Sequence, residues 1–375
     1  MRAPRVALVR QRYAHDGGAE RFVSRALEAL RSRDVRLTLV TREWRGGEGF
    51  DVLTCNPFYL GRLWRDWSFA RAVCRRLEAE SFDLVQSHER LACCDVYRAG
   101  DGVHREWLVQ RARAQGVLER FGTALNPYHY YVKRAERRLF ESPILKAVIC
   151  NSRMVQAEIR HYFGVPEDKL HVIYSGVDTG AFHPHLKKRR GEIRVRHGIP
   201  ENATLFLFVG SGFERKGMAS LLQAMALLRG ETYLLVVGRD RKLARFRTRA
   251  QQLNLGRRVL FVGAQQDVKP YYGAADVLVL PTLYDPFPNV ALEAMASGLP
   301  VITSLKSGAA ELIENGANGY VCDALDVPAL TAHLRSVTPQ TAGIMGMRAR
   351  ATVASMTLER MSVALLELYN SLLHY

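Results

Sequence analysis

The sequence lacks any apolar run that approaches about 18 residues, the length a helix needs to cross a bilayer. The apolar stretch before Arg10 is only four residues long, too short for the core of a secretory signal peptide. The six cysteines form no C-x-x-C pair and no metal-ligand spacing, and the adjacent Cys93 and Cys94 have poor geometry for an ordinary disulfide. We therefore expect a reduced, cytoplasmic protein without a membrane-spanning helix.

The signatures of three nucleotide or metal sites are also missing. The pair Gly17-Gly18 has no G-x-G-x-x-G spacing, which argues against a nicotinamide dehydrogenase. A P-loop places its lysine after the last glycine, whereas here Lys216 precedes Gly217. No D-x-D pair is present, the pair that a metal-dependent transferase typically uses. We therefore expect neither a metal nor a cofactor.

Acidic residues are in deficit, with 37 Asp and Glu against 53 Lys and Arg, which gives a net charge of +16. Such a surface attracts nucleic acid, phosphorylated substrates or an acidic membrane face. The excess is spread along the chain, with 30 basic and 21 acidic residues up to Leu170 and 23 and 16 after it. Because no nucleic-acid module or basic tail accompanies this charge, we expect no nucleic-acid partner.

Short apolar runs alternate with helical patterns in the first part of the chain, which is typical of a parallel α/β sheet. The weakest segment is Glu89–Glu141, where we expect helices and a long loop. We predict strands over Arg5–Arg10, Val35–Thr41, Phe82–Gln86, Ala147–Asn151 and Leu170–Tyr174, and helices over Ala19–Arg31 and from Ser152 to Phe163.

The alternation starts again after the polar segment Thr179–Pro200. Here we predict strands over Leu205–Val209, Tyr233–Val237, Val259–Val262, Val277–Pro281 and Val301–Thr303, and helices over Met218–Leu228, Leu243–Leu253 and Met356–His374. Two such series predict two doubly wound domains, residues 1–177 and 178–355, and a terminal helix over 356–375 that could pack back on the first domain. Ligands of such folds bind at the carboxyl ends of strands, so we expect a site in the cleft between them.

The glycine-rich segment Val209–Gly217 carries two cations just before its last glycine. It lies between a predicted strand and a predicted helix. Arg215 and Lys216 at the carboxyl end of a strand, beside a helix N-terminus, suit a diphosphate. The alternative is two solvated charges on a loop. Gly17 and Gly18 lie between a strand and a helix in the same way, where backbone N–H groups can approach an anion; the alternative there is a plain turn.

Two carboxylates flank the start of a predicted helix near residue 289. Asp285 follows a strand, Asn289 opens the helix, and Glu293 lies about one turn in. Carboxylates accept hydrogen bonds from sugar hydroxyls, and the backbone amides between them can meet a phosphate. The alternative is that the acids only stabilise the helix N-terminus.

Together these motifs resemble the retaining glycosyltransferases of the family 4 type, which have the GT-B fold. Segments 209–217 and 95–101 most resemble the lipopolysaccharide core glucosyltransferase I group within that family. The matching residues are Gly17 to Glu20, Ser175 to Asp178 with Phe182 and Pro184, Gly210 to Gly217, and Asp285 to Pro300. The resemblance implies two facing Rossmann-like domains, the first for the acceptor and the second for a nucleotide sugar.

The resemblance also implies roles for single residues. Arg215 and Lys216 would grip the donor diphosphate, Asp285 would contact the transferred sugar, and Glu293 would bind the ribose. The family usually has Glu where this chain has Asp285, so the sugar could be shifted or different. Asp101 and His104 would lie at the junction of sugar and acceptor, and the catalytic group would be Asp101, Arg215, Lys216 and Asp285. The remaining donor contacts would be Gly17, Gly18, Gly210, Arg239, Val262, Asn289 and Val290.

The resemblance implies metal-independent, front-face transfer of a hexose with retention, with glucose from UDP-glucose as the first choice. The acceptor would be a lipid-linked saccharide, the inner-core heptose of lipopolysaccharide, and the enzyme would bind the anionic inner face of the cytoplasmic membrane. Other donors, GDP-mannose or UDP-N-acetylglucosamine, remain open, as does a GT-B nucleotide-sugar epimerase. Residues suited to a membrane interface are Arg62, Arg65, Arg105, Arg111 and Arg113, interleaved with Trp64, Trp67 and Trp107. The alternative is a solvated face with half-buried tryptophans.

Overall fold

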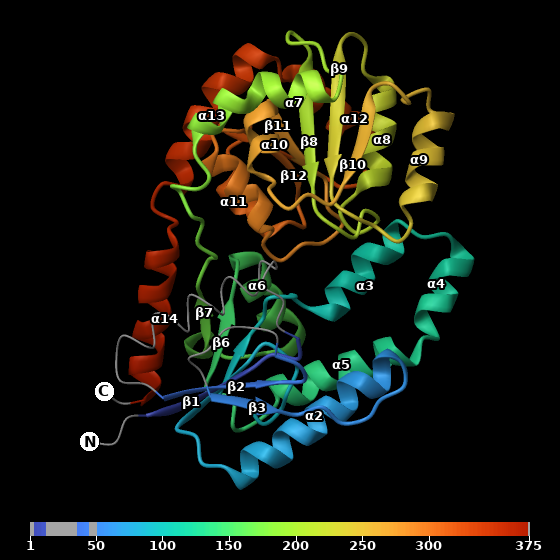
Figure 1. The fold of residues 1–375 in the computed structure, drawn as a ribbon. Helices are drawn as coiled ribbons and strands as arrows, with labels where there is room; N and C mark the ends of the chain where they lie inside the picture. Colours follow the sequence, from blue (N-terminus) through green and yellow to red (C-terminus); the bar gives the residue numbers. More distant parts are fainter. Residues whose placement is uncertain (1–3, 13–35, 45–50, 374–375) are drawn as a thin grey trace. The chain divides into compact units, whose positions relative to one another are not determined.

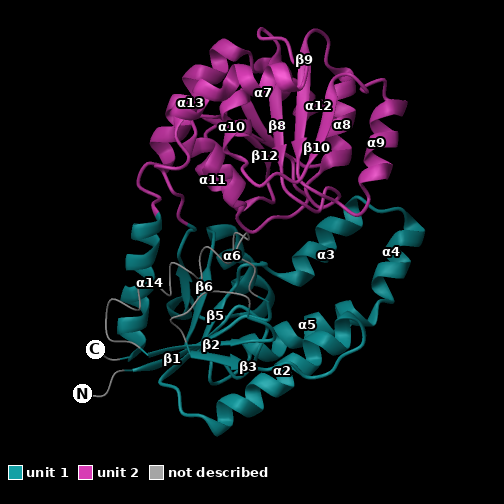
Figure 2. Cartoon of the chain, viewed as in Figure 1, with its two compact units in different colours: residues 1–175, 358–375 teal, residues 176–357 magenta. Residues whose placement is uncertain are grey.

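Two parallel β-sheets organise the computed structural model, which describes residues 4–12, 36–44 and 51–373 (Figure 1). The chain divides into two units, shown in different colours in Figure 2. Unit 1 comprises Met1–Ser175 and Leu358–Tyr375, and unit 2 comprises Gly176–Thr357. This arrangement confirms the predicted α/β class with two Rossmann-like domains. The helix predicted over Ala19–Arg31 lies outside the described residues.

The sheet of unit 1 has seven strands in the order β3-β2-β1-β4-β5-β6-β7. The strands are β1 (Arg5–Val9), β2 (Arg36–Thr41), β3 (Asp51–Thr54), β4 (Leu84–Ser87), β5 (Val96–Arg98), β6 (Ala147–Cys150) and β7 (Leu170–Val172). The helices are α2 (Gly61–Ala79), α3 (His104–Arg113), α4 (Val117–Ala124), α5 (Pro127–Phe140), α6 (Arg153–Phe163) and α14 (Leu358–Leu373). The strand order reverses between β1 and β4, which is the switch point of a doubly wound sheet.

Both faces of this sheet are covered, because the central strand β1 is buried and apolar from Val6 to Val9. Val9 packs in one cluster with Phe69 of α2 and Leu139 of α5. Leu8, its neighbour in the strand, points to the opposite face, where its cluster includes Tyr369 of α14. The terminal helix α14 therefore belongs to the core of unit 1.

The sheet of unit 2 has six strands in the order β10-β9-β8-β11-β12-β13. The strands are β8 (Thr204–Val209), β9 (Thr232–Val237), β10 (Val259–Gly263), β11 (Val277–Leu280), β12 (Val301–Ser304) and β13 (Gly319–Cys322). The helices are α7 (Arg190–Arg196), α8 (Met218–Leu227), α9 (Leu243–Gln252), α10 (Lys269–Ala274), α11 (Asn289–Ala296), α12 (Val327–Ser336) and α13 (Pro339–Val353). Here the order reverses between β8 and β11, so the ends of these two strands mark the switch point.

The structure corrects the sequence prediction in several places. The short strands β3, β5 and β13 and the long helix α2 were not predicted. β5 contains only two apolar residues, and α2 carries many arginines, so neither has a clear apolar period. The segment 89–141 holds the helices expected there, α3, α4 and α5, and it also holds β5, whereas the expected long loop is absent from it.

Cys74 of α2 and Cys93 form a disulfide, so the expectation of reduced cysteines is wrong for this pair. The packing of α2 against the connection between β4 and β5 brings their Cα atoms to 5.8 Å across a separation of 19 residues. The other cysteines, Cys55, Cys94, Cys150 and Cys322, are free and buried. Among the described residues, no helix is long and apolar enough to cross a membrane.

Candidate functional site

The glycine-rich loop between β8 and α8 holds Arg215 and Lys216 at the carboxyl end of a central strand. Gly210 has φ 139°, and a Cβ atom there would lie 2.8 Å from Cε of Lys216. Gly217 has φ 76°, and its Cβ atom would lie 1.8 Å from the carbonyl oxygen of Pro281. Glycine is therefore required at both positions, because the loop folds closely over the lysine side chain and against the end of β11.

Asp285 brings the two cations together. Its Oδ2 atom lies 3.0 Å from Nζ of Lys216 and 3.2 Å from Nη1 of Arg215. The side chains of Lys216 and Asp285 are about one-tenth exposed, whereas that of Arg215 is 37% exposed. Burial alone would raise the pKa of Asp285, but the charges and hydrogen bonds of Lys216 and Arg215 outweigh it and hold that pKa below its ordinary value. The carboxylate is therefore ionised and fixed.

Backbone hydrogen bonds hold the loop against the end of β11. The carbonyl oxygen of Arg215 accepts the N–H of Leu283 at 2.8 Å and the hydroxyl of Thr282 at 3.0 Å. The guanidinium of Arg215 donates to the carbonyl of Tyr284 at 2.9 Å. These hydrogen bonds hold both cations in place at the end of the sheet.

The helix α11 presents the second predicted carboxylate. Glu293 is buried and accepts a hydrogen bond of 2.8 Å from the hydroxyl of Tyr272. Asn289 and Val290 form the first turn of α11, which follows Pro288 at the N-cap position without a side-chain cap among the described residues. The carboxylate of Asp285 contacts Lys216 and Arg215, and it forms no side-chain cap of α11 among the described residues.

The ends of β9 and β10 lie beside this loop. The N–H of Gly238 donates to the carbonyl of Gly263 at 2.8 Å, and a Cβ atom at Gly238 would lie 1.9 Å from the carbonyl oxygen of Gly210. Arg239 comes two residues after the end of β9, and Val262 lies within β10. Unit 2 therefore brings every described residue that was predicted for the donor to one edge of its sheet. Gly17 and Gly18 lie outside the described residues.

The two residues predicted for the acceptor, Asp101 and His104, lie in unit 1 near Arg90. Asp101 is 72% exposed, with Oδ2 3.9 Å from Nη1 of Arg90. The backbone N–H of His104 and Nε of Arg90 both donate to Oε1 of Glu136, at 2.8 and 3.0 Å. The ring nitrogen Nε2 of His104 lies 3.0 Å from Nδ1 of His129. Burial, and then the nearby cations beginning with Arg90, lower the pKa of His104 to about 3, so its imidazole is neutral.

Three members of this second cluster were missed by the sequence analysis. His129 and Glu136 lie on the buried face of α5, at the helical spacing of its apolar residues Val132 and Leu139. Polar residues on an apolar helix face indicate a partner, and that signal was available in the sequence. Arg90 follows β4 but belongs to no motif. Among the described residues, no group of three or more His, Cys, Asp or Glu side chains could hold a metal ion.

Comparison with known proteins finds a glycosyltransferase family model in each half of the chain. Residues 16–181 match the model for Glycosyltransferase Family 4, and residues 189–357 match the model for Glycosyl transferases group 1. The lipopolysaccharide glucosyltransferase WaaG of Escherichia coli is 28% identical over 84% of each chain. A crystal structure of WaaG superposes with a TM-score of 0.82 at 24% identity, over 97% of this chain and 99% of that one. The Anabaena protein HepE in complex with UDP and glucose has a TM-score of 0.72 at 19% identity, over 98% and 99%.

Proposed function

Because the chain belongs to the family 4 and group 1 glycosyltransferases and is a hexosyltransferase, we propose that it transfers glucose from UDP-glucose to a lipid-linked saccharide, with retention of configuration. The observation that carries this proposal is the cluster of Arg215, Lys216 and Asp285 at the switch point of unit 2. Similarity to the lipopolysaccharide glucosyltransferase favours glucose as the sugar and inner-core heptose as the acceptor.

Cleavage of the sugar–phosphate bond builds negative charge on the departing diphosphate. Lys216 and Arg215 offer two positive charges against the one negative charge of Asp285, so the cluster has a net positive charge for that anion. Lys216 is buried, where an interaction between charges is stronger than in water. We assign the stabilisation of the leaving group to these two cations, without a metal ion.

The other residues that we assign to the donor lie along the same edge of the sheet. Both cations contact Oδ2 of Asp285, and we assign its Oδ1 atom to a hydroxyl of the transferred sugar. Glu293, oriented by the hydroxyl of Tyr272, accepts from the ribose. Arg239 and Val262 lie at strand ends beside the loop, where we place the base.

Asp101 and the neutral His104 are assigned to the acceptor. In the front-face path, the leaving phosphate oxygen takes the proton of the acceptor hydroxyl, so no strong protein base is needed. The exposed carboxylate of Asp101 can orient that hydroxyl. The neutral imidazole of His104 offers the acceptor a ring nitrogen for hydrogen bonding and brings no positive charge.

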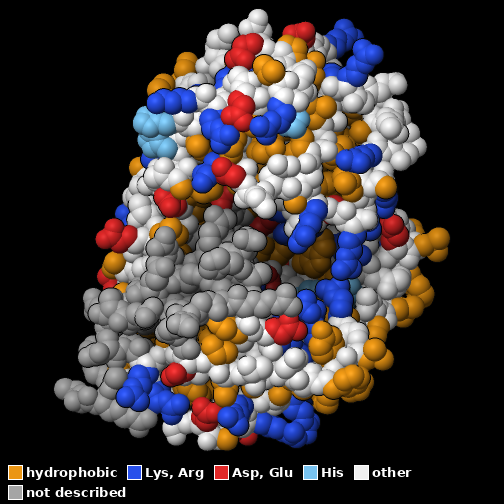
Figure 3. Space-filling model, viewed as in Figure 1, with side chains coloured by type: hydrophobic (Ala, Val, Ile, Leu, Met, Phe, Trp, Pro, Cys, Tyr) orange, Lys and Arg blue, Asp and Glu red, His pale blue; other side chains and the backbone are white. Residues whose placement is uncertain are grey.

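An exposed apolar surface on α4 supports the proposal of a lipid-linked acceptor. No residue of α4 is buried, and its side chains Val117, Leu118 and Phe121, with Leu125 directly after it, are 66–89% exposed. Figure 3 shows apolar side chains along this edge of unit 1 with Lys and Arg side chains close by. Apolar residues on one face of a helix with arginines around it suit an anionic lipid surface. The predicted interface residues Trp64 and Trp67 are also exposed. We propose that the enzyme is peripheral on the inner face of the cytoplasmic membrane.

The test is transfer by the purified full chain from UDP-glucose to lipopolysaccharide that lacks glucose, in the presence of EDTA. The account expects a product whose new linkage has the α configuration of the donor, as seen by the anomeric proton in NMR. Transfer only from GDP-mannose or UDP-N-acetylglucosamine would replace the proposed donor. Conversion of the nucleotide sugar without any acceptor would replace the transferase with an epimerase.

A further inference from the structure

The carboxylate of Glu136 lies in the interior of unit 1, on α5, and joins two segments that are distant in the sequence. Its side chain is 1% exposed. One oxygen, Oε1, accepts hydrogen bonds from Nε of Arg90 at 3.0 Å and from the backbone N–H of His104 at 2.8 Å. Arg90 lies in the connection between β4 and β5, and His104 is the first residue of α3. A single buried atom therefore holds both segments against α5.

The contacts of this carboxylate are incomplete for a group that only stabilises the fold. A buried carboxylate costs free energy unless its oxygens are hydrogen-bonded, and an apolar side chain of similar volume often serves equally well. The second oxygen of Glu136, Oε2, is buried and has no hydrogen-bond partner among the described residues. Burial raises the pKa of Glu136, although the charge of Arg90 and the N–H of His104 act in the opposite direction. Stability alone does not explain a carboxylate at this position, which points to a part in the reaction.

Arg90 connects Glu136 to Asp101. Burial alone would lower the pKa of Arg90, but neighbouring groups, first Tyr97 and then Glu136, raise it well above its ordinary value, so the guanidinium is charged. Its Nη1 atom lies 3.9 Å from Oδ2 of Asp101, whose side chain is 72% exposed. Because the guanidinium is planar, the hydrogen bond at Nε also fixes the direction in which Nη1 points. Glu136 therefore sets the position of the positive charge beside Asp101.

The same oxygen holds the backbone that follows Asp101. The helix α3 begins at His104, and its N-cap residue Val103 makes no side-chain cap. The first N–H groups of a helix have no partner within the helix, and negative charge is favourable beside them. Glu136 accepts the N–H of His104 and so supplies this cap from another helix. Only Gly102, with φ 67°, and Val103 separate Asp101 from the capped residue. Glu136 thus fixes Asp101 from two sides, through a cation and through the backbone.

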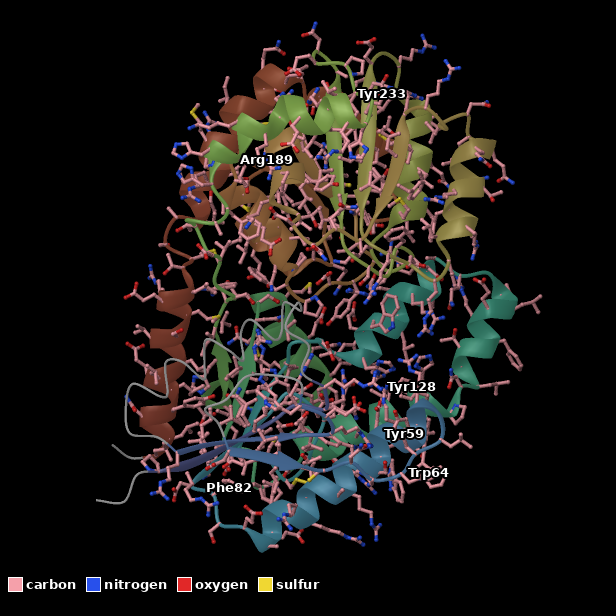
Figure 4. All side chains as sticks on the ribbon, viewed as in Figure 1. Tyr59, Trp64, Phe82, Tyr128, Arg189 and Tyr233 are labelled. Atoms are coloured by element: carbon pink, nitrogen blue, oxygen red, sulfur yellow. A yellow bond between two sulfur atoms is a disulfide. The ribbon has the colours of Figure 1, made fainter. Side chains whose placement is uncertain are left out.

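Ring contacts hold the start of α3 independently of Glu136. Nε2 of His104 lies 3.0 Å from Nδ1 of His129, which is about two helical turns before Glu136 on the buried face of α5. The ring of Tyr128, which is labelled in Figure 4, lies edge-on to both imidazoles, with centroids at 6.5 Å from His104 and 5.9 Å from His129. A change at position 136 should therefore remove a charge and leave the helices folded.

We propose that Glu136 is a positioning residue of the transferase: by holding Arg90 and the start of α3, it orients the carboxylate of Asp101 toward the acceptor hydroxyl. Glu136 itself contacts no substrate in this account. The inference rests on the proposed function, in which Asp101 orients that hydroxyl. Loss of Glu136 should therefore slow transfer to the acceptor, whereas donor binding and the slow hydrolysis of the donor by water should remain as they are.

The test is a double-mutant cycle of Glu136→Gln and Asp101→Asn in the full chain, with UDP-glucose and lipopolysaccharide that lacks glucose. Glu136→Gln keeps an oxygen for the N–H of His104 but removes the charge that opposes Arg90. It should lower kcat for transfer more than about tenfold, since misplaced groups cost rates of this order. The KM for UDP-glucose and the release of UDP without acceptor should stay within about twofold of the wild type. In the Asp101→Asn background, Glu136→Gln should cost less than about twofold more, because the group that it positions is already lost.

A matched control and a second variant accompany the cycle. Glu141→Gln makes the same chemical change at the exposed C-cap of α5, where the carboxylate pairs with Arg137, and should react as the wild type does. Arg90→Lys keeps the positive charge but loses the planar fork that joins Glu136 to Asp101, so it should show the same split between transfer and hydrolysis. Melting curves report the folding of each variant, and Arg90→Lys decides the matter if Glu136→Gln is unfolded.

Three results would overturn the inference alone: wild-type kcat in Glu136→Gln, an equal loss of transfer and of acceptor-free UDP release, or additive losses in the double variant. Wild-type transfer by Asp101→Asn would overturn both the assigned role of Asp101 and the inference that depends on it. Absence of transfer by the wild type would count against the proposed function itself, and the inference would fall with it. The thermal shift of the same samples with UDP reports on the donor site separately.

Discussion

Lys216 and Asp285 form an almost fully buried ion pair across 69 residues of sequence, with Nζ 3.0 Å from Oδ2. The pair joins the loop after β8 to the loop after β11, the two strands at which the sheet of unit 2 reverses. Nη1 of Arg215 contacts the same Oδ2 atom at 3.2 Å. The cluster therefore fixes two cations beside each other at the place where such folds bind their ligands.

Replacing Lys216 by alanine should lower kcat by more than about a hundredfold, the usual cost of removing a group that stabilises charge in the transition state. The rate is measured as UDP release in the presence of acceptor. The control is Lys146→Ala, which removes a lysine from an ion pair with Asp95 in unit 1 and should leave the rate unchanged. Near-wild-type kinetics in Lys216→Ala would remove this residue from the mechanism.

The variant Asp285→Asn should reduce the free energy of unfolding at pH 7 by about 3 kcal/mol, because it leaves a buried lysine without its counter-charge. Because the cations hold the pKa of Asp285 below its ordinary value, the stabilisation is present above about pH 4 and is lost as the pH falls through the folded-state pKa. Urea denaturation of both proteins at several pH values measures this difference. A difference that stays constant below pH 4, or that is absent at pH 7, would contradict the role of the pair.

The variant Asp285→Glu restores the residue that the family usually has and adds one methylene group. If the carboxylate contacts the transferred sugar, the ratio of kcat/KM for UDP-glucose and other nucleotide sugars should change. Asp267→Glu adds the same methylene at an exposed position beside Lys269 and serves as the control. An unchanged donor profile would limit Asp285 to holding the cations.

The imidazole of His104 should remain neutral between pH 5 and 8, because burial and neighbouring cations lower its pKa to about 3. Its C2–H resonance, assigned by comparison with His104→Gln, should not shift across that range. Since the unfolded pKa is about 6.5, the folded chain binds fewer protons between about pH 3 and 6.5. The histidine therefore makes the wild type lose stability relative to His104→Gln as the pH falls through this window. A titration midpoint near 6.5 would show that the site is not desolvated.

The exposed face of α4 should insert into anionic vesicles. The double change Leu118→Glu and Phe121→Glu removes two apolar contacts of about 1.5 kcal/mol or more each and should lower the vesicle partition coefficient at least tenfold. The measurement is co-sedimentation with phosphatidylglycerol vesicles, at low and high salt. Val195→Glu places one glutamate on a similarly exposed apolar position of unit 2 and is compared with Leu118→Glu alone; it should leave vesicle binding unchanged. If the wild type and the double variant sediment equally with the vesicles, α4 is not the segment that contacts the membrane.

The sequence analysis named Arg215, Lys216 and Asp285 as candidate site residues, but it did not predict the contacts between them. Lys216 and Asp285 were each assigned to the ligand, one to the diphosphate and one to the sugar. Their ion pair could not be predicted from spacing, because it depends on β8 and β11 being neighbours in the sheet. Strand order is set by crossovers between distant segments, and a single sequence does not record it.

A pocket of unit 1, whose lining includes Asp66 and Glu89, could not be predicted from the sequence for a different reason. Asp66 lies in an arginine-rich segment that was assigned to a membrane interface, and Glu89 lies in the segment with the weakest pattern. Neither belongs to a motif, and only the packing of α2 and α5 against the ends of β1 and β4 brings them together. The long apolar strands of both units, in contrast, were predicted because a strand buried on both faces has few alternatives.

The most direct measurement of the central claim is a thermal-shift titration of the wild type and Lys216→Ala with UDP, GDP, ADP and their common sugar conjugates, all with EDTA present. The account predicts that UDP and UDP-glucose raise the melting temperature of the wild type without metal, and that Lys216→Ala loses most of this shift. Stabilisation by another nucleotide alone, or an equal shift in both proteins, would contradict the assignment of Lys216 to the diphosphate of a UDP-sugar.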